Sequence, residues 1–167
     1  QGGERGLQQR LRRPWGDGGL QLMASRQSQR GEDLFDATQV GVGGSDGWTR
    51  GTDGMRRHAL ALRADRGGIA LSLMHARRTK GTPMTVDLIY GDPRNRYVDT
   101  YSQINLEGAT ALGEATRLTT RLFAGRYRFD GDFAIDYPPP TLNRDIARAS
   151  WRGLELRLQS TAFEGHR

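Results

Sequence analysis

Hydrophobic and polar residues alternate with a period of two in seven stretches of the chain. Successive side chains of a β-strand point to opposite faces of a sheet, so this pattern predicts strands with one apolar and one polar face. The chain is therefore expected to be all-β. The predicted strands cover about 4–13, 19–28, 55–65, 69–79, 97–111, 116–129 and 146–160.

The segments that connect these strands alternate between short and long. The short, polar ones are 13–19, 65–68, 111–115 and 161–165, and the long ones are about 28–54, 80–96 and 130–145. In an antiparallel up-and-down meander, successive connections lie at opposite edges of the sheet. All short turns are therefore expected at one edge and all long loops at the other, an asymmetry typical of transmembrane β-barrels.

The strand alternation by itself is compatible with two architectures. In the third stretch Leu60, Leu62 and Ala64 lie on one predicted face, and Arg57 and Arg63 lie on the other. A soluble β-sandwich would give the same pattern, with its charged residues in solvent. Long strands and alternating loops favour the barrel, because strands of soluble proteins average about 5–6 residues.

Aromatic residues near the loop-side ends of the strands also favour the barrel. Membrane barrels carry girdles of aromatic side chains at this level, although ordinary cross-strand packing would place aromatics there as well. The residues interpreted as a girdle are Tyr97, Tyr101, Tyr127, Phe129 and Trp151.

Composition excludes several classes of protein. Only 35% of residues are hydrophobic, the mean hydropathy is −0.70, and no run of about 18 apolar residues predicts a membrane helix. No segment of the chain reads as a signal peptide. Cysteine is absent, which excludes disulfides and thiolate zinc sites. The net charge of +6 comes from arginines spread along the chain, so nucleic acid is not an expected partner.

No motif predicts catalysis or a resident cofactor. The glycine-rich segment 40–46 (VGVGGSD) lacks the preceding parallel strand and the following helix of a phosphate-binding loop. Asp130, Asp132 and Asp136 do not have the spacing of a calcium loop. The three histidines have no companions at metal-ligand spacing. The chain is therefore predicted not to be an enzyme and to hold no metal.

Seven is an odd number of strands for a barrel. Bacterial single-chain barrels normally have an even number, and an open sheet would leave two unpaired edges in lipid. His166 and Arg167 are interpreted as the start of an eighth strand. The chain is therefore expected to be a piece of a larger barrel and to aggregate when it is expressed alone.

Several segments resemble the barrel of TonB-dependent outer-membrane receptors. Together they extend over nearly the whole chain, and their motifs are patterns of barrel wall and loops. They are 24–35 (ASRQSQRGEDLF), 77–83 (RRTKGTP), 89–99 (IYGDPRNRYVD), 121–139 (RLFAGRYRFDGDFAIDYPP) and 151–158 (WRGLELRL).

The resemblance implies that residues 1–167 form part of a 22-stranded barrel in the bacterial outer membrane. It implies active uptake of siderophore-bound iron, cobalamin or a similar scarce solute, energised through TonB. The implied partners are outer-membrane lipid and lipopolysaccharide, the receptor's own plug domain, the TonB complex and the small-molecule ligand. The plug, the TonB-contacting box and the terminal strand of the family pattern are not found in this chain. A porin-like passive channel and a soluble cationic all-β module for nucleic acid or acidic glycan are the alternative functions.

Two sets of candidate site residues follow. Arginine and aromatic side chains in long loops can bind an anionic, aromatic-rich chelate, and loop packing or contact with lipopolysaccharide is the alternative role of each. The loop candidates are Trp48, Arg50, Tyr90, Arg94, Arg96 and Tyr137. A second set is expected to face the lumen and the plug, so charge reversal there should loosen plug retention. Its members are Arg57, Arg63, Arg117, Arg121, Glu155 and Arg157.

Overall fold

The computed structural model of the chain describes residues 3–83, 88–135 and 139–162. These residues form nine strands and one short 3-10 turn. They are β1 (Glu4–Trp15), β2 (Gly18–Gln29), β3 (Asp33–Val40), η1 (Val42–Gly44), β4 (Asp46–Arg50), β5 (Met55–Arg66), β6 (Ile69–Gly81), β7 (Arg96–Ala111), β8 (Thr116–Ile135) and β9 (Thr141–Ser160).

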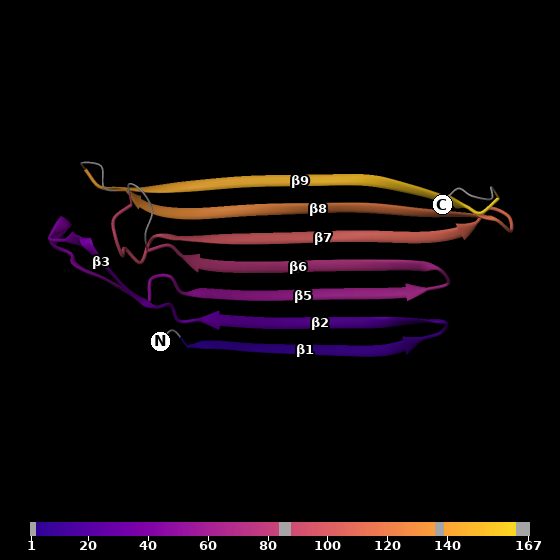
Figure 1. Cartoon of the computed structure of the whole chain (residues 1–167), viewed down its shortest axis with the longest axis horizontal. Helices are drawn as coiled ribbons and strands as arrows, with labels where there is room; N and C mark the ends of the chain where they lie inside the picture. Colours follow the sequence, from indigo (N-terminus) through magenta and orange to yellow (C-terminus); the bar gives the residue numbers. More distant parts are fainter. Residues whose placement is uncertain (1–2, 84–87, 136–138, 163–167) are drawn as a thin grey trace.

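Seven of the strands form one antiparallel sheet in the order β1-β2-β5-β6-β7-β8-β9. Each strand pairs with the next strand of the sheet along the chain, so the sheet is a meander (Figure 1). The two-residue turns after β1 and β5 lie at the same edge, and the longer connections after β2 and β6 lie at the opposite edge. The expected all-β meander and the expected placement of its connections are confirmed.

The tightest turns are built from glycine. Gly67 and Gly68 connect β5 to β6, and both have positive φ, of 57° and 78°. A two-residue hairpin turn with positive φ at both positions matches the twist of the strands beside it. The polar segment 65–68 therefore fixes the register in which Leu62 pairs with Leu73.

The predictions of long loops at 130–145 and 28–54 are wrong in part, because both segments contain strand residues. The segment 130–145 was expected to be a loop, but β8 continues to Ile135 and β9 begins at Thr141. Gly131 pairs with Asp145 in the ladder, so the Asp130-Gly131 pair does not make a turn. Aromatic and acidic residues alternate through this segment, and that strand pattern outweighs the turn preference of Asp-Gly.

The segment 28–54 also contains regular structure that the sequence pattern did not predict. Strands β3 and β4 pair as a separate two-stranded hairpin, which projects beyond the long-loop edge of the sheet (Figure 1). The glycine-rich segment 40–46 forms its connection, with η1 at the tip. This segment is therefore a hairpin tip and not part of a βα unit.

The register assigns every strand residue to one of two faces. Leu22, Leu62, Leu73 and Ile104 form one row across β2, β5, β6 and β7. We call this side the leucine face; it carries the odd positions of β1 and β6 and the even positions of the other sheet strands. The opposite side is called the aromatic face. The alternation predicted from the sequence is confirmed in all seven strands.

The sheet is a single layer without a hydrophobic core. Among the described residues Ala134 is the one buried hydrophobic residue. Leu154 and Leu158 are 59% and 64% exposed, and no described element covers the leucine face. The outer edges of β1 and β9 have no partner strand within the described ranges, so the sheet is open. Soluble domains instead bury their apolar faces between two packed layers.

The aromatic residues interpreted as a girdle lie on the wrong face for that role. Tyr97, Tyr101, Tyr127 and Phe129 are in the loop-side half of their strands and Trp151 is at the middle of β9, but all five are at positions opposite the leucines. They pack on one another, as in the Tyr97–Phe129 stack with ring centroids 5.5 Å apart. No helix in the described part of the chain has the length and apolar character to cross a membrane.

Candidate functional site

The leucine face carries an apolar band with a sharp boundary on the loop side. Going from the leucines toward the loops, each strand reaches a polar residue. These residues are Arg26, His58, His75, Ser102, Arg126 and Arg152 on β2, β5, β6, β7, β8 and β9. Arg26 pairs with His58, and His75 pairs with Ser102, which pairs with Arg126. The boundary shifts toward the turns by four residues from β2 to β9.

The boundary on the turn side shifts in the same direction. Arg66 closes the band on β5, Thr110 on β7, Thr116 on β8 and Ser160 on β9. This boundary also moves by four residues, over four strand-to-strand steps. With a rise of about 3.3 Å per residue and about 4.8 Å between strands, the two boundaries run at about 30° to the rows of paired residues. The apolar band is therefore a slanted stripe, eight positions wide on β5, β7 and β9 and ten positions wide on β8.

The width of the stripe follows from β5, where both boundaries are charged or titratable. His58 and Arg66 are eight positions apart, which is about 26 Å along the strand and about 23 Å across a stripe slanted by that angle. The midpoint is Leu62. In the described strands the stripe holds no charged side chain, and Gln9 and Thr120 are its polar interruptions.

The aromatic face has a different organisation, in which polar side chains pair with one another. In its loop-side half, Arg78 donates from Nε and Nη2 to Asp99 Oδ2 at 3.0 and 2.6 Å. The hydroxyl of Tyr127 donates to the other oxygen of the same carboxylate. The Arg78 guanidinium also lies over the Tyr97 ring, 5.5 Å from its centroid. Asp99, only 17% exposed, is thereby held between a cation and a phenol.

In the turn-side half of the aromatic face, three of the predicted lumen residues come together. Arg121 donates from Nη2 to Asn105 Oδ1 at 3.0 Å and lies 3.5 Å from Glu155 across the strand pair. Arg157 lies 3.9 Å from the same glutamate. Gln103 donates to Asn105 at 3.0 Å and extends the network along β7.

The other three predicted lumen residues share this face but lie apart. Arg63 contacts Ser72 Oγ at 3.4 Å and Asp65 at 3.8 Å. Arg57 pairs with Arg78 in the register, near the loop-side end of β5. Arg117 is close to the turn edge of β8. The six residues are therefore on one face, as predicted, but form one cluster of three and three separate positions.

Aromatic rings on this face cover glycines of the neighbouring strand. A Cβ at Gly125 would overlap Cζ2 of Trp151, and a Cβ at Gly153 would overlap Cζ of Phe123. Each ring thus occupies the space that a side chain opposite would take. These glycines are required by a close approach, and sequence alternation alone did not single them out.

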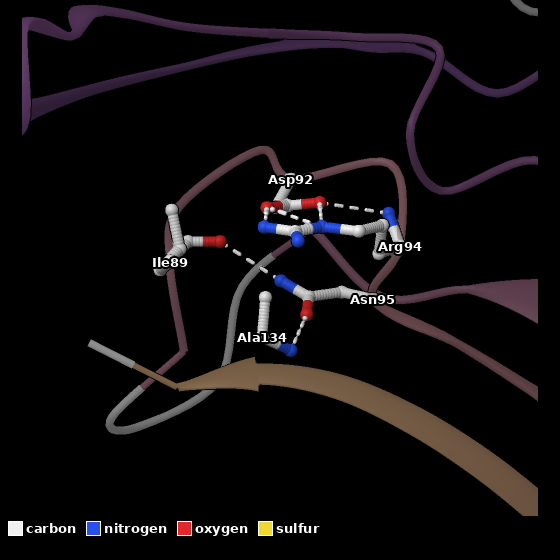
Figure 2. A network of polar contacts seen from close by, with 5 residues as sticks. All are labelled: Ile89, Asp92, Arg94, Asn95 and Ala134. Atoms are coloured by element: carbon white, nitrogen blue, oxygen red, sulfur yellow. Dashed lines mark hydrogen bonds and ion pairs between the residues drawn. The ribbon is translucent and has the colours of Figure 1, made fainter. Parts of the chain in front are cut away.

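The long-loop edge holds the most buried polar residue of the described chain, which the sequence analysis missed. Asn95 is 1% exposed, and both polar atoms of its side chain are hydrogen-bonded (Figure 2). Its Nδ2 donates to the carbonyl of Ile89 at 2.8 Å, and its Oδ1 accepts from the amide of Ala134 at 2.6 Å. Asn95 therefore joins the loop before β7 to the end of β8. The signal in the sequence was the turn Asp92-Pro93-Arg94-Asn95, with aspartate and proline at the positions that a type I turn favours.

Arg94, a predicted ligand contact, is already paired within that turn. Its Nη2 lies 2.6 Å from Asp92 Oδ2, and its Nε donates to both carboxylate oxygens (Figure 2). The hydrogen bonds from Arg94 hold the pKa of Asp92 below its usual range. The pair fixes the turn that presents Asn95, so in this structure Arg94 has a positioning role.

Tyr90, another predicted ligand contact, holds the β3–β4 hairpin. Its hydroxyl lies 3.3 Å from the carbonyl oxygen of Leu34 and 3.1 Å from that of Gly47, one on each strand region of the hairpin. Desolvation raises the pKa of this phenol. The two long connections at this edge are therefore attached to each other through Tyr90.

The remaining loop candidates do not converge on one point. Trp48 is 43% exposed and packs against Phe35, with centroids 5.1 Å apart. Arg50 pairs with Asp46 at 2.7 Å on the hairpin. Arg96 begins β7 on the leucine face, on the side of the sheet opposite the six lumen candidates. Tyr137, like Asp136 and His166, lies outside the described residues.

The chemistry of these groups is that of binding and positioning. Within the described ranges, no group of three or more histidine, cysteine, aspartate or glutamate residues is placed to hold a metal ion. No family model, no curated protein and no solved structure matches this chain. The candidate site therefore consists of the slanted leucine stripe, the polar network of the aromatic face and the joined loops at one edge.

Proposed function

We propose that the seven-stranded sheet is a segment of the wall of a transmembrane β-barrel, with the leucine face toward lipid and the aromatic face toward the lumen. The slanted, uncharged stripe on an uncovered face carries this proposal. Its width of about 23 Å compares with the apolar band of about 25 Å of outer-membrane barrels. Its slant of about 30° is close to the tilt of about 35–45° between barrel strands and the membrane normal.

The slant has a direct physical origin in this proposal. When strands are tilted, a membrane of constant thickness meets each strand slightly further along than the one before it. The boundaries of the lipid-facing residues must then shift in one direction across the sheet. The residues from Arg26 to Arg152 do so in two steps of two positions, from β5 to β6 and from β8 to β9. A second sheet packed at about 30° could also cover a slanted stripe, but the described chain contains no such sheet.

The direction of the edge strands supports the idea of a larger wall. Because the sheet has seven antiparallel strands, β1 and β9 run in the same direction. Pairing β9 with β1 would create a parallel seam, whereas an odd number of further strands between them would keep every pair antiparallel. Closure also removes the open edges, whose unpaired backbone groups are costly in lipid.

Within this proposal, the wall belongs to a TonB-dependent receptor for siderophore-bound iron, cobalamin or a similar scarce solute. The sequence resemblance supports this finer assignment, and so does the polar network around Arg121 and Glu155, which offers charged and amide groups to a plug inside the lumen. The hairpin joined to the neighbouring loop by Tyr90 would stand at the ligand entrance.

A cysteine scan tests the barrel proposal directly, because the chain has no cysteine of its own. Single substitutions from Ala59→Cys to Asp65→Cys are labelled with a nitroxide in phosphatidylcholine vesicles. We expect the even positions to be accessible to membrane-dissolved oxygen and the odd positions to a water-soluble relaxation agent. Uniform accessibility to the aqueous agent, or a detergent-free soluble monomer, would overturn the proposal.

An uptake assay tests the receptor assignment separately. Cells that produce the receptor take up labelled ferric siderophore or cobalamin, and a protonophore should abolish this uptake. Passage of small solutes that a protonophore leaves unchanged would instead support the passive channel and overturn the receptor assignment.

A further inference from the structure

Arginines gather on the leucine face directly beyond the loop-side boundary of the stripe. A groove over β6–β9 is lined there by six of them: Arg77, Arg96, Arg126, Arg128, Arg144 and Arg148. Two aspartates, Asp130 and Asp132, lie in the same groove. Six positive and two negative side chains give the groove a net charge of +4.

The two aspartates neutralise only part of this charge. Asp130 pairs with Arg128 at 2.6 Å, and Asp132 lies 3.9 Å from Arg144. In the part of the chain that the structure describes, the other four arginines have no acidic partner within 4.0 Å. Arg128 and Arg148 also face each other directly in the β8–β9 register, and like charges at such positions repel.

We infer that this arginine groove binds the phosphate groups of a phosphorylated lipid whose acyl chains contact the leucine stripe. The inference rests on the proposed function. Arginine suits this ligand, because its planar guanidinium donates two parallel hydrogen bonds to phosphate oxygens. A bound phosphate between Arg128 and Arg148 would turn a repulsive pair into two attractive contacts.

The position of the groove selects a lipid over other polyanions. Arg126 is the polar residue at the edge of the stripe on β8, and Arg128 lies two residues, about 7 Å, further toward the loops. A ligand with phosphates attached to an apolar body therefore satisfies both surfaces at once. Nucleic acid would match the arginines but would leave the adjoining leucines, such as Leu122 at 49% exposure, without apolar contact.

The test uses the full chain and vesicles of two compositions, phosphatidylcholine alone and phosphatidylcholine with diphosphorylated lipid A. The variant combines Arg126→Gln with Arg148→Gln. The matched control combines Arg10→Gln with Arg12→Gln, which removes the same charge from the aromatic face of β1. Binding is measured by flotation, with a short DNA duplex and free inorganic phosphate as competing probes.

We expect the unaltered chain to bind the phosphorylated vesicles more tightly than phosphatidylcholine alone. In the groove variant this preference should fall about 30-fold, because each arginine near an anionic surface contributes about fivefold to binding. The control should stay within about twofold. An equal loss in groove variant and control would overturn the inference, because net charge alone would then explain binding. Arginine-dependent binding of DNA without a lipid preference would also overturn it. Insertion into both vesicles without preference defeats this inference alone, whereas a monodisperse, detergent-free monomer that associates with neither vesicle defeats the barrel proposal.

Discussion

The two faces of the sheet use their side chains in opposite ways. On the aromatic face, polar groups pair within the chain, as Arg78, Asp99 and Tyr127 do, and rings cover the glycines beside them. On the leucine face, Leu154 and Leu158 are more than half exposed, and Arg126 and Arg148 have no acidic partner among the described residues. Side-chain networks within the chain therefore occupy part of the aromatic face, with Arg57 and Arg117 outside them, whereas no described element covers the apolar side chains of the leucine face.

This difference shows that period-two alternation has two physical meanings in one sheet. Alternation along one strand shows only that its two faces differ in polarity. The contacts between side chains of neighbouring strands show on which face the polar groups bond to one another. Substitutions on the two faces should therefore act on different equilibria. Changes on the leucine face should alter membrane association, and changes on the aromatic face or in the loops should alter the stability of the sheet itself.

The largest effect is expected from a charge at the centre of the stripe. In Leu62→Arg, a guanidinium replaces the midpoint leucine and should make insertion into phosphatidylcholine vesicles less favourable by about 2–4 kcal/mol. The control Ala61→Arg places the same charge one position away on the aromatic face. The inserted fraction is measured by flotation, and equal losses in the two variants would erase the proposed difference between the faces.

The strands and faces could be predicted because they depend on local alternation. The apolar face of β5 follows from its own residues Leu60, Leu62 and Ala64, whatever packs beside the strand. The Gly67-Gly68 turn then fixes the register between β5 and β6. The extension of β8 past Asp130 was not predicted, because Asp-Gly pairs favour turns, although Phe129 and Phe133 continue the alternation.

The candidate site was less predictable because its contacts join distant segments. The residues around Asn95 in the sequence do not indicate that its Oδ1 accepts a hydrogen bond from the amide of Ala134, 39 residues later in the chain. Likewise, Tyr90 was selected as an aromatic loop residue for ligand contact, but it holds the hairpin through Leu34 and Gly47. The six predicted lumen residues share a face, as predicted, because the odd or even position of a residue in its strand determines its face. Which of them form a cluster depends on contacts between side chains of neighbouring strands.

A loop substitution should cost nearly as much but leave membrane association unchanged. Asn95→Ala removes both side-chain hydrogen bonds and leaves the buried amide of Ala134 unpaired, at a cost of about 2–3 kcal/mol. Hydrogen exchange of the Ala134 amide should become about 100-fold faster. Asn143→Ala is the control, because Asn143 is exposed and bonds only to Asp145 in its neighbourhood. Equal exchange in both variants would show that Asn95 does not hold the loop.

A smaller cost is expected where a ring covers a glycine. Gly125→Ala places a methyl group in the space of the Trp151 ring and should destabilise the sheet by about 1–3 kcal/mol. Gly108→Ala is the control on the leucine face, where the nearest atom to a new Cβ is Cγ1 of Ile69 at 3.9 Å. Denaturant unfolding in micelles measures both. If Gly108→Ala costs as much as Gly125→Ala, glycine is favoured for backbone reasons and not for the ring.

The smallest expected effect is a response of the 92–95 turn to acid. Because Arg94 holds the pKa of Asp92 below its usual range of about 4, the charged carboxylate stabilises the turn at neutral pH. That contribution is complete above the ordinary pKa and is lost only as the pH falls through the lowered one. Exchange of the Asn95 amide, which bonds to the carbonyl of Asp92 at 3.0 Å, should therefore accelerate below about pH 4 beyond its intrinsic rate. Asp92→Asn should remove this acid response while the leucine face keeps its membrane association; an unchanged response in that variant would assign the titration to another group.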